Sequence, residues 1–232
     1  MNIWIMGDSW GTPNYFQPMA DWRAKNHISE LLADSGHTIT NFSLNGTSNL
    51  NPWLTAVSHD INHVHVPDLI IWIHTSLMRD YYAYHDEISR TSDDLMEKMH
   101  IAAEYVYKTI ADIIHQVGSP PLIVIEGHGL RVLPEFDQHM VKPYHMVKHW
   151  REHICGTPLP RAHWVSEINY VEHFGQTLPN LDKVISNIEC VQDAISDSGK
   201  FPDHSHPGDQ AHRMLYNMLL PVIEKISQDL SG

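Results

Sequence analysis

Two short segments near opposite ends of the chain carry residue types that suit acyl transfer. The first is Gly7-Asp8-Ser9, and the second contains Asp203 and His206. A serine hydroxyl is a weak nucleophile unless a base takes its proton, and that base needs a third group to orient it. Asp203 and His206 are three residues apart, so the carboxylate can reach the imidazole Nδ1 and leave Nε2 for a hydroxyl. The segments together indicate a triad, although each alone is also a common turn.

Five apolar runs predict the strands that must position these segments. Several runs are almost continuously hydrophobic, as expected for a parallel sheet with helices on both faces. Alternation with helical segments predicts right-handed crossovers and a three-layer α/β/α sandwich around a five-stranded parallel sheet. The predicted strands are Ile3–Met6, Thr38–Leu44, Leu69–His74, Leu122–Glu126 and Trp164–Ile168.

Apolar residues spaced by three or four positions predict the helices. One helix begins behind Asn51, and a second begins at Ser92 and ends at Gly118. The second presents one apolar stripe, which consists of Met99, Ala103, Val106, Ile110 and Ile114. Two further helices are predicted over 181–195 and 211–226. The apolar stripe of the last one is Ala211, Met214, Leu215, Met218, Val222 and Ile226. We expect a single domain over 1–232, with an inserted loop at 129–160 that is rich in His and Pro.

Ligands of an open parallel sheet bind beyond the carboxyl ends of its strands, so the residues that follow each strand matter most. Gly7 is expected to allow a sharp turn that exposes Ser9. The second strand is followed by Asn45-Gly46-Thr47-Ser48-Asn49, and the third ends in His74-Thr75-Ser76.

These blocks, in this order, resemble those of the SGNH (GDSL-like) hydrolase family, over nearly the whole chain. The resemblance implies a flavodoxin-like fold and an esterase in which Ser9 is the nucleophile and Asp203 and His206 complete the triad. It also implies that Gly46 offers its backbone N–H to the oxyanion. No metal and no organic cofactor is expected.

The third block departs from the family pattern, which is Gly-x-Asn-Asp with the Asn side chain as an oxyanion donor. This chain has His74 in place of the Gly and Ser76 in place of the Asn. Loss of one oxyanion donor typically costs about 10²–10³ in turnover. Three explanations follow: Ser76 substitutes, Asn45 or Asn49 supplies the donor, or the protein is a degenerate member with little activity.

The expected substrate is a small acyl ester, such as an acetyl group on a carbohydrate. Trp10 and Trp53 are expected to line the mouth of the site, since aromatic rings stack on sugars. Arg79 and Asp80 follow the third strand and are expected to form a solvated ion pair rather than to bind substrate.

Composition excludes some classes and leaves two rivals. The chain has 15 Lys+Arg against 28 Asp+Glu, a formal net charge of -13, which disfavours nucleic acid as a partner. No apolar run is long enough to span a bilayer and no basic leader precedes Asp8, so we expect no membrane partner and a cytoplasmic protein. The rivals are a non-catalytic carbohydrate- or protein-binding module and a metal-dependent hydrolase that uses Asp8 with some of the 19 histidines.

Overall fold

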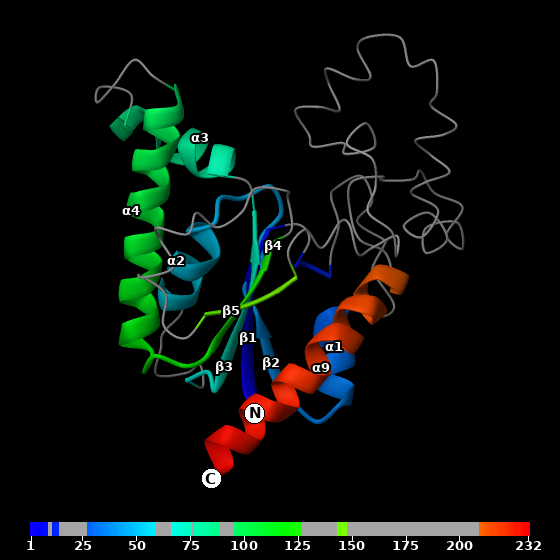
Figure 1. Cartoon of the computed structure of the whole chain (residues 1–232). Helices are drawn as coiled ribbons and strands as arrows, with labels where there is room; N and C mark the ends of the chain where they lie inside the picture. The colour runs from blue at the N-terminus through cyan, green and yellow to red at the C-terminus, as the bar shows by residue number, and fades with distance from the viewer. Residues whose placement is uncertain are drawn as a thin grey trace, which may run out of the picture.

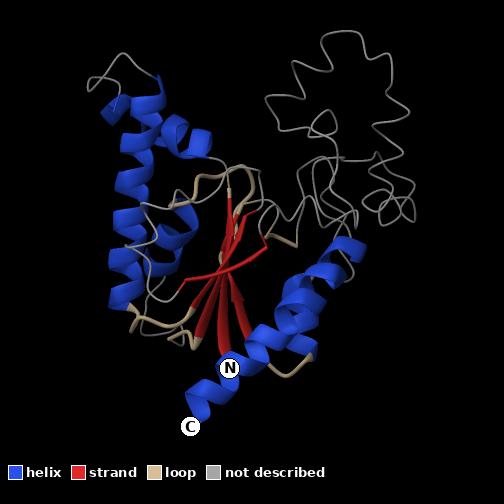
Figure 2. Ribbon diagram, in the orientation of Figure 1, coloured by secondary structure: helices blue, strands red, loops and turns tan. Residues whose placement is uncertain are grey.

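The fold is built on a five-stranded sheet in which every neighbouring pair of strands is parallel. The structure is a computed structural model that describes residues 1–8, 11–13, 27–58, 66–75, 77–88, 95–126, 143–147 and 209–232. The strand order is β2-β1-β3-β4-β5. Figure 2 shows the strands, in red, between helices on their two sides. The strands are β1 (Asn2–Gly7), β2 (Thr38–Asn41), β3 (Leu69–His74), β4 (Leu122–Glu126) and β5 (Pro143–Val147).

Four predicted strands are confirmed, although β2 ends at Asn41 and not at Leu44 as predicted. The fifth strand of the described sheet was not predicted. β5 (Pro143–Val147) lies inside the segment 129–160 that was expected to be a loop. It is an edge strand in the described sheet, pairs with β4 through an irregular register and begins with a proline. An edge strand tolerates proline and needs no continuous apolar run, so the periodicity that revealed the inner strands was absent. The predicted strand Trp164–Ile168 lies outside the described residues.

Helices cover both faces of the sheet, which confirms the three-layer architecture. Figure 1 shows α2 (Asn51–Ser58), α3 (Leu77–Ile88) and α4 (Leu95–Gln116) on one side and α1 (Ile28–Asp34) and α9 (Asp209–Ser231) on the other. No helix in the described parts of the chain is both long and apolar enough to cross a lipid bilayer.

Alternate side chains of the inner strands fill two separate cores. In β1, Ile3 and Ile5 pack with residues of α1 and α9, whereas Trp4 and Met6 pack with residues of α2 and α4. All six residues of β3 are buried. Successive side chains of a strand point to opposite faces, so a strand buried on both faces is apolar along most of its length, as β3 is up to His74.

Helix α4 follows its predicted pattern closely, whereas α9 follows it in part. All five residues of the predicted α4 stripe are buried, and Gly118, at a φ of 91°, follows the helix end as predicted. On α9, Met218 and Val222 were expected in the stripe but are only partly buried. The predicted helix over 181–195 lies outside the described residues. Among the side chains of α9 that the structure describes, the buried apolar ones are Leu215, Leu219, Ile223 and Ile226.

Candidate functional site

The candidate site lies where the strand order reverses, at the carboxyl ends of β1 and β3. The chain passes from β1 to β2 on one side and then returns to place β3 on the other side of β1. Gly7 pairs with Ile73 in the register, so Asp8 leaves β1 level with the end of β3, which Thr75 follows directly. Such a reversal leaves a crevice between the two loops, and ligands of open α/β sheets bind there.

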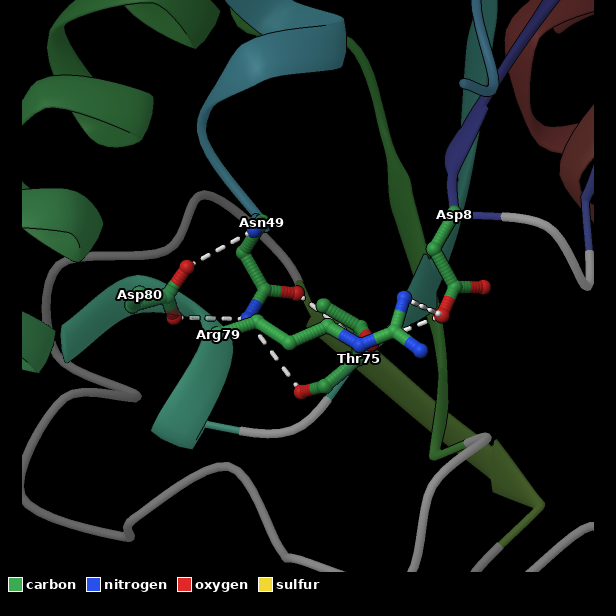
Figure 3. A network of polar contacts seen from close by, with 5 residues as sticks. All are labelled: Asp8, Asn49, Thr75, Arg79 and Asp80. Atoms are coloured by element: carbon green, nitrogen blue, oxygen red, sulfur yellow. Dashed lines mark hydrogen bonds and ion pairs between the residues drawn. The ribbon is translucent and has the colours of Figure 1, made fainter. Parts of the chain in front are cut away.

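Asp8 is a buried carboxylate held from two directions (Figure 3). Its Oδ2 accepts a hydrogen bond from Thr75 Oγ1 at 2.7 Å and one from Arg79 Nη1 at 3.1 Å. The Asp8 side chain is 0% exposed and that of Arg79 is 14% exposed. The expected solvated ion pair between Arg79 and Asp80 is therefore wrong, because the guanidinium faces a buried carboxylate of another loop.

Asn49 joins the loop after β2 to the end of β3. Its Oδ1 accepts from the Thr75 backbone N–H at 2.8 Å, and its Nδ2 donates to the Thr75 carbonyl oxygen at 3.2 Å. Nδ2 also donates to Asp80 Oδ2 at 2.7 Å. Both amide hydrogens are thus bound within the protein, so Asn49 has no hydrogen left for an oxyanion in this geometry.

Asp80, in the first turn of α3, completes the network. Its Oδ1 accepts from the Asn49 backbone N–H at 2.7 Å, so Asn49 binds both carboxylate oxygens (Figure 3). Burial raises the pKa of Asp80 to about 7, while the hydrogen bonds from Asn49 and the charge of Arg79 act in the opposite direction. Desolvation disfavours the charged form of a carboxyl group more than these contacts restore it.

Gly7 and Gly11 are packed closely against their neighbours. Gly11 donates its N–H to the Asp8 carbonyl oxygen at 3.0 Å and accepts a bond from Asn41 Nδ2 at 2.7 Å. A Cβ at Gly11 would lie 2.3 Å from Ser43 Oγ, and one at Gly7 would lie 3.1 Å from the Cβ of Ile73. Gly7 has no left-handed φ, so the expected role in a sharp turn is replaced by close packing against β3.

Gly46 lies at the exposed tip of the loop after β2, next to the exposed Asn45. Its φ of 66° falls in the left-handed region that favours glycine, and no atom lies within 4 Å of a Cβ built there. The backbone of Gly46 is therefore accessible, as a backbone donor to a bound substrate needs to be. The rest of the loop, from Thr47 to Asn49, is buried.

His74 is accommodated in an aromatic cluster behind the site. Its Nε2 shares a hydrogen bond with Tyr107 Oη of α4, and its ring stacks on Tyr107 with centroids 5.9 Å apart. Its ring also meets Trp72 edge-on at 5.1 Å. His74, which is larger than the glycine of the family pattern, is thus accommodated in the core between β3 and α4.

Trp53 was expected to line the mouth of the site, and this prediction is wrong. The side chain is 0% exposed and packs edge-on against Trp72, with centroids 5.8 Å apart. Trp53 lies on the face of α2 that covers the sheet. Trp53 is close in sequence to the loop at Gly46, which suggested an exposed side chain. In the helix, however, its side chain points toward the sheet and not toward solvent.

The remaining site predictions fall on residues that the structure does not describe. They are Ser9, Trp10, Ser76, Asp203 and His206. Their described neighbours in sequence are Asp8, Thr75 and the start of α9 at Asp209. Figure 1 shows that α9 begins at the carboxyl-end side of the sheet and runs back towards the N-terminus of β1. The described residues nearest these blocks in sequence therefore lie at the carboxyl-end side of the sheet.

The sequence did not reveal the hydrogen-bond partners of four residues at the carboxyl end of the sheet, which are Asn41, Thr75, Arg79 and Asp80. The available signal was a pair of charged residues shortly after a strand with five apolar residues in a row, where little solvent is left for them. Such a pattern indicates that the charged side chains are buried, but it does not indicate which groups bind them.

Comparison with known proteins shows similarity of fold. No protein-family model matches the sequence, and no curated protein matches it. The fold is similar to that of a carbohydrate esterase whose active site is described as having divergent catalytic and non-catalytic binding functions, with a TM-score of 0.52 at 10% identity. That match covers 97% of this chain and 64% of the esterase, so this chain spans less than two thirds of its length.

Two other solved structures are similar at lower TM-scores. TesA matches at 0.48 with 10% identity, over 97% of this chain and 99% of its own. Axe2, an acetylxylan esterase from Geobacillus stearothermophilus, matches at 0.41 with 13% identity, over 95% and 92%. At these identities the similarity concerns the fold. The chain has the α/β/α fold of SGNH hydrolases, as the resemblance of its motifs implied.

Proposed function

We propose that this chain, built on the fold of the SGNH hydrolases, is a serine esterase that hydrolyses small acyl esters. In the proposed reaction Ser9 Oγ attacks the ester carbonyl while His206 takes its proton, and Asp203 orients and stabilises the imidazolium. The backbone N–H groups of Ser9 and Gly46, together with the Ser76 hydroxyl, bind the oxyanion. His206 then protonates the leaving alcohol, and water hydrolyses the acyl-enzyme by the same route.

One observation carries the proposal: a buried network joins the loops that precede or contain the proposed groups. Asp8 directly precedes Ser9, Thr75 directly precedes Ser76, and Asn49 closes the loop that carries Gly46. Asp8 bonds to Thr75, and Thr75 bonds to Asn49 through both its N–H and its carbonyl group. A scaffold of this kind holds reacting groups in fixed relative positions, which electrostatic stabilisation of a transition state requires.

The proposed substrate is an acetyl or similarly small ester on a carbohydrate. The solved structure similar in fold at a TM-score of 0.52 is a carbohydrate esterase, which supports this class. Trp10 remains the proposed aromatic contact to the sugar. Asn49 is left out of the proposed oxyanion hole because its amide hydrogens are bound to Thr75 and Asp80.

A specific observation favours a second candidate, a non-catalytic carbohydrate-binding module. The third block has Ser76 where the family has an Asn donor, and a hydroxyl has a shorter reach than a carboxamide. The carbohydrate esterase of similar fold displays non-catalytic binding functions as well as catalytic ones. A metal-dependent reaction at Asp8 is disfavoured, because the carboxylate is buried and its charge is already paired with the guanidinium of Arg79.

The test is active-site labelling of the full chain with a fluorophosphonate, on wild type and Ser9→Ala. In parallel, hydrolysis of p-nitrophenyl acetate is followed with and without EDTA. We expect labelling of Ser9, loss of both signals in Ser9→Ala and no effect of EDTA. The rate should fall below about pH 6.5, where an imidazole takes up a proton.

Each other outcome points elsewhere. Folded protein that neither labels nor turns over contradicts the esterase and favours the binding module, which glycan binding would then test. Activity that survives Ser9→Ala but is lost with EDTA supports the metal-dependent rival.

A further inference from the structure

The buried contact between Asn49 and Asp80 is suited to align the loop after β2 with the end of β3. Asn49 bonds to both the N–H and the carbonyl group of Thr75, as a neighbouring strand would. This pattern fixes the orientation of the carboxamide, because only Oδ1 can accept from the Thr75 N–H and only Nδ2 can donate to its carbonyl. The loop after β2 therefore has one register relative to β3.

Asp80 fixes that carboxamide in turn. Its two oxygens accept from the Asn49 side chain and backbone, each at 2.7 Å. Asn49 and Asp80 are 2% and 0% exposed, respectively, so solvent does not compete for these bonds. Buried, fully bonded polar groups specify one geometry strongly, because any displacement leaves a donor or acceptor unsatisfied.

We propose that Asn49 and Asp80 are positioning residues for the esterase reaction: together they hold the loop that carries Gly46 against the end of β3. The inference rests on the proposed function. It assigns to these residues the alignment of the oxyanion-binding loop, in a chain whose third block lacks the usual Asn. Neither residue touches the substrate; both act through the backbone at Gly46 and Thr75.

A reciprocal exchange of the two side chains tests the inference. Asn49→Asp keeps the acceptor for the Thr75 N–H but sets two carboxylates against each other. In the double variant Asn49→Asp/Asp80→Asn, the new carboxylate at position 49 accepts from the Thr75 N–H and from the new amide at position 80. The oxygen of that amide in turn accepts from the backbone N–H at position 49. The exchange thus restores three of the four bonds that Asn49 makes in the wild type.

The measurement is kcat and KM on p-nitrophenyl acetate, with kcat divided by the fraction of protein that labels at Ser9 with a fluorophosphonate. Asn49→Asp should lower this kcat by about 10- to 100-fold and leave KM within about twofold, because oxyanion contacts act mainly in the transition state. The double variant should recover most of the loss. Asp112→Asn, on the exposed face of α4, is the matched control and should behave as wild type.

The outcomes separate the inference from the function on which it rests. If wild type labels and turns over but Asn49→Asp has an unchanged kcat per labelled serine, the positioning role is overturned and the esterase stands. A lower labelled fraction with unchanged kcat would assign the pair to folding alone, which also overturns it. A double variant no better than Asn49→Asp contradicts the reciprocal contact. If wild type neither labels nor turns over, both proposals fall.

Discussion

Asp8 shows how the environment of a single residue decides its role. In the sequence it belongs to a short polar block and is also a candidate metal ligand. In the structure its carboxylate is fully buried, bound by a hydroxyl and by a guanidinium. Burying a charge is costly unless it is paired and hydrogen-bonded, so Arg79 and Thr75 are what allow Asp8 to lie beneath the site.

Removing the cation from this pair should be strongly destabilising. We expect Arg79→Met to lower the free energy of unfolding by about 3–5 kcal/mol, because the Asp8 carboxylate stays buried without its guanidinium. Adding Asp8→Asn should recover most of the loss, since a neutral amide needs no counter-charge. Urea unfolding at neutral pH measures both.

The control for that prediction is an exposed ion pair on the same side of the sheet. Lys108 and Glu104 on α4 have side chains that are 54% and 47% exposed. Lys108→Met should cost less than about 1 kcal/mol. An Arg79→Met variant as mild as this control, or a double variant as unstable as Arg79→Met, would contradict the assignment.

At the scale of elements, helix ends are set by backbone conformation. Gly118, at a φ of 91°, donates its N–H to the His115 carbonyl oxygen at 3.2 Å and so helps to close the end of α4. No atom lies within 4 Å of a Cβ built at Gly118. A side chain there meets no clash with neighbours, and only the left-handed backbone penalises it.

We therefore expect Gly118→Ala to lower the free energy of unfolding by about 1–2 kcal/mol, and Gly118→Asn to cost less because asparagine tolerates this region. Gln116→Ala, at an exposed position of the same helix end, should change stability little. Thermal and urea unfolding give the comparison. Equal stabilities for the alanine and glycine forms would show that the left-handed turn is not retained.

At the scale of the whole molecule, the layer formed by α1 and α9 contains a buried histidine pair. His27 and His212 are both 0% exposed, and their ring centroids lie 4.3 Å apart. Burial, and then the nearby His27, hold the pKa of His212 well below its usual value of 6.5. His212 therefore binds a proton less readily in the folded state than in the unfolded state.

The sign of the resulting pH dependence follows from proton binding. Above about pH 6.5 neither state protonates His212 and its contribution to stability is constant. As the pH falls below that value the unfolded state binds more protons, so the free energy of unfolding decreases. His212→Gln should make this decrease shallower between about pH 6.5 and 5.5, as measured by urea unfolding at several pH values.

An exposed histidine provides the comparison for this effect. His100 on α4 is exposed, and His100→Gln should keep the wild-type slope. A His212→Gln variant with an unchanged slope would show that His212 is not the group responsible.

The sequence by itself determined the parts of the protein that depend on local pattern. Continuous apolar runs located β1, β3 and β4, and a stripe with helical spacing located the buried face of α4. These patterns are readable because a strand or helix that is buried must repeat its apolar residues with its own geometric period. The motif order also indicated the fold, which the structure confirms.

Only the tertiary structure decided which polar groups meet. Asp8 finds partners 67 and 71 residues away, and Asn49 binds Asp80 across 31 residues. Arg79 bonds to Asp8, although Asp80 is its neighbour in sequence. The burial of Trp53 and the edge strand that begins at Pro143 were likewise decided by the tertiary structure. Burial and distance in the folded chain select such contacts, and neither quantity is written in the local order of residues.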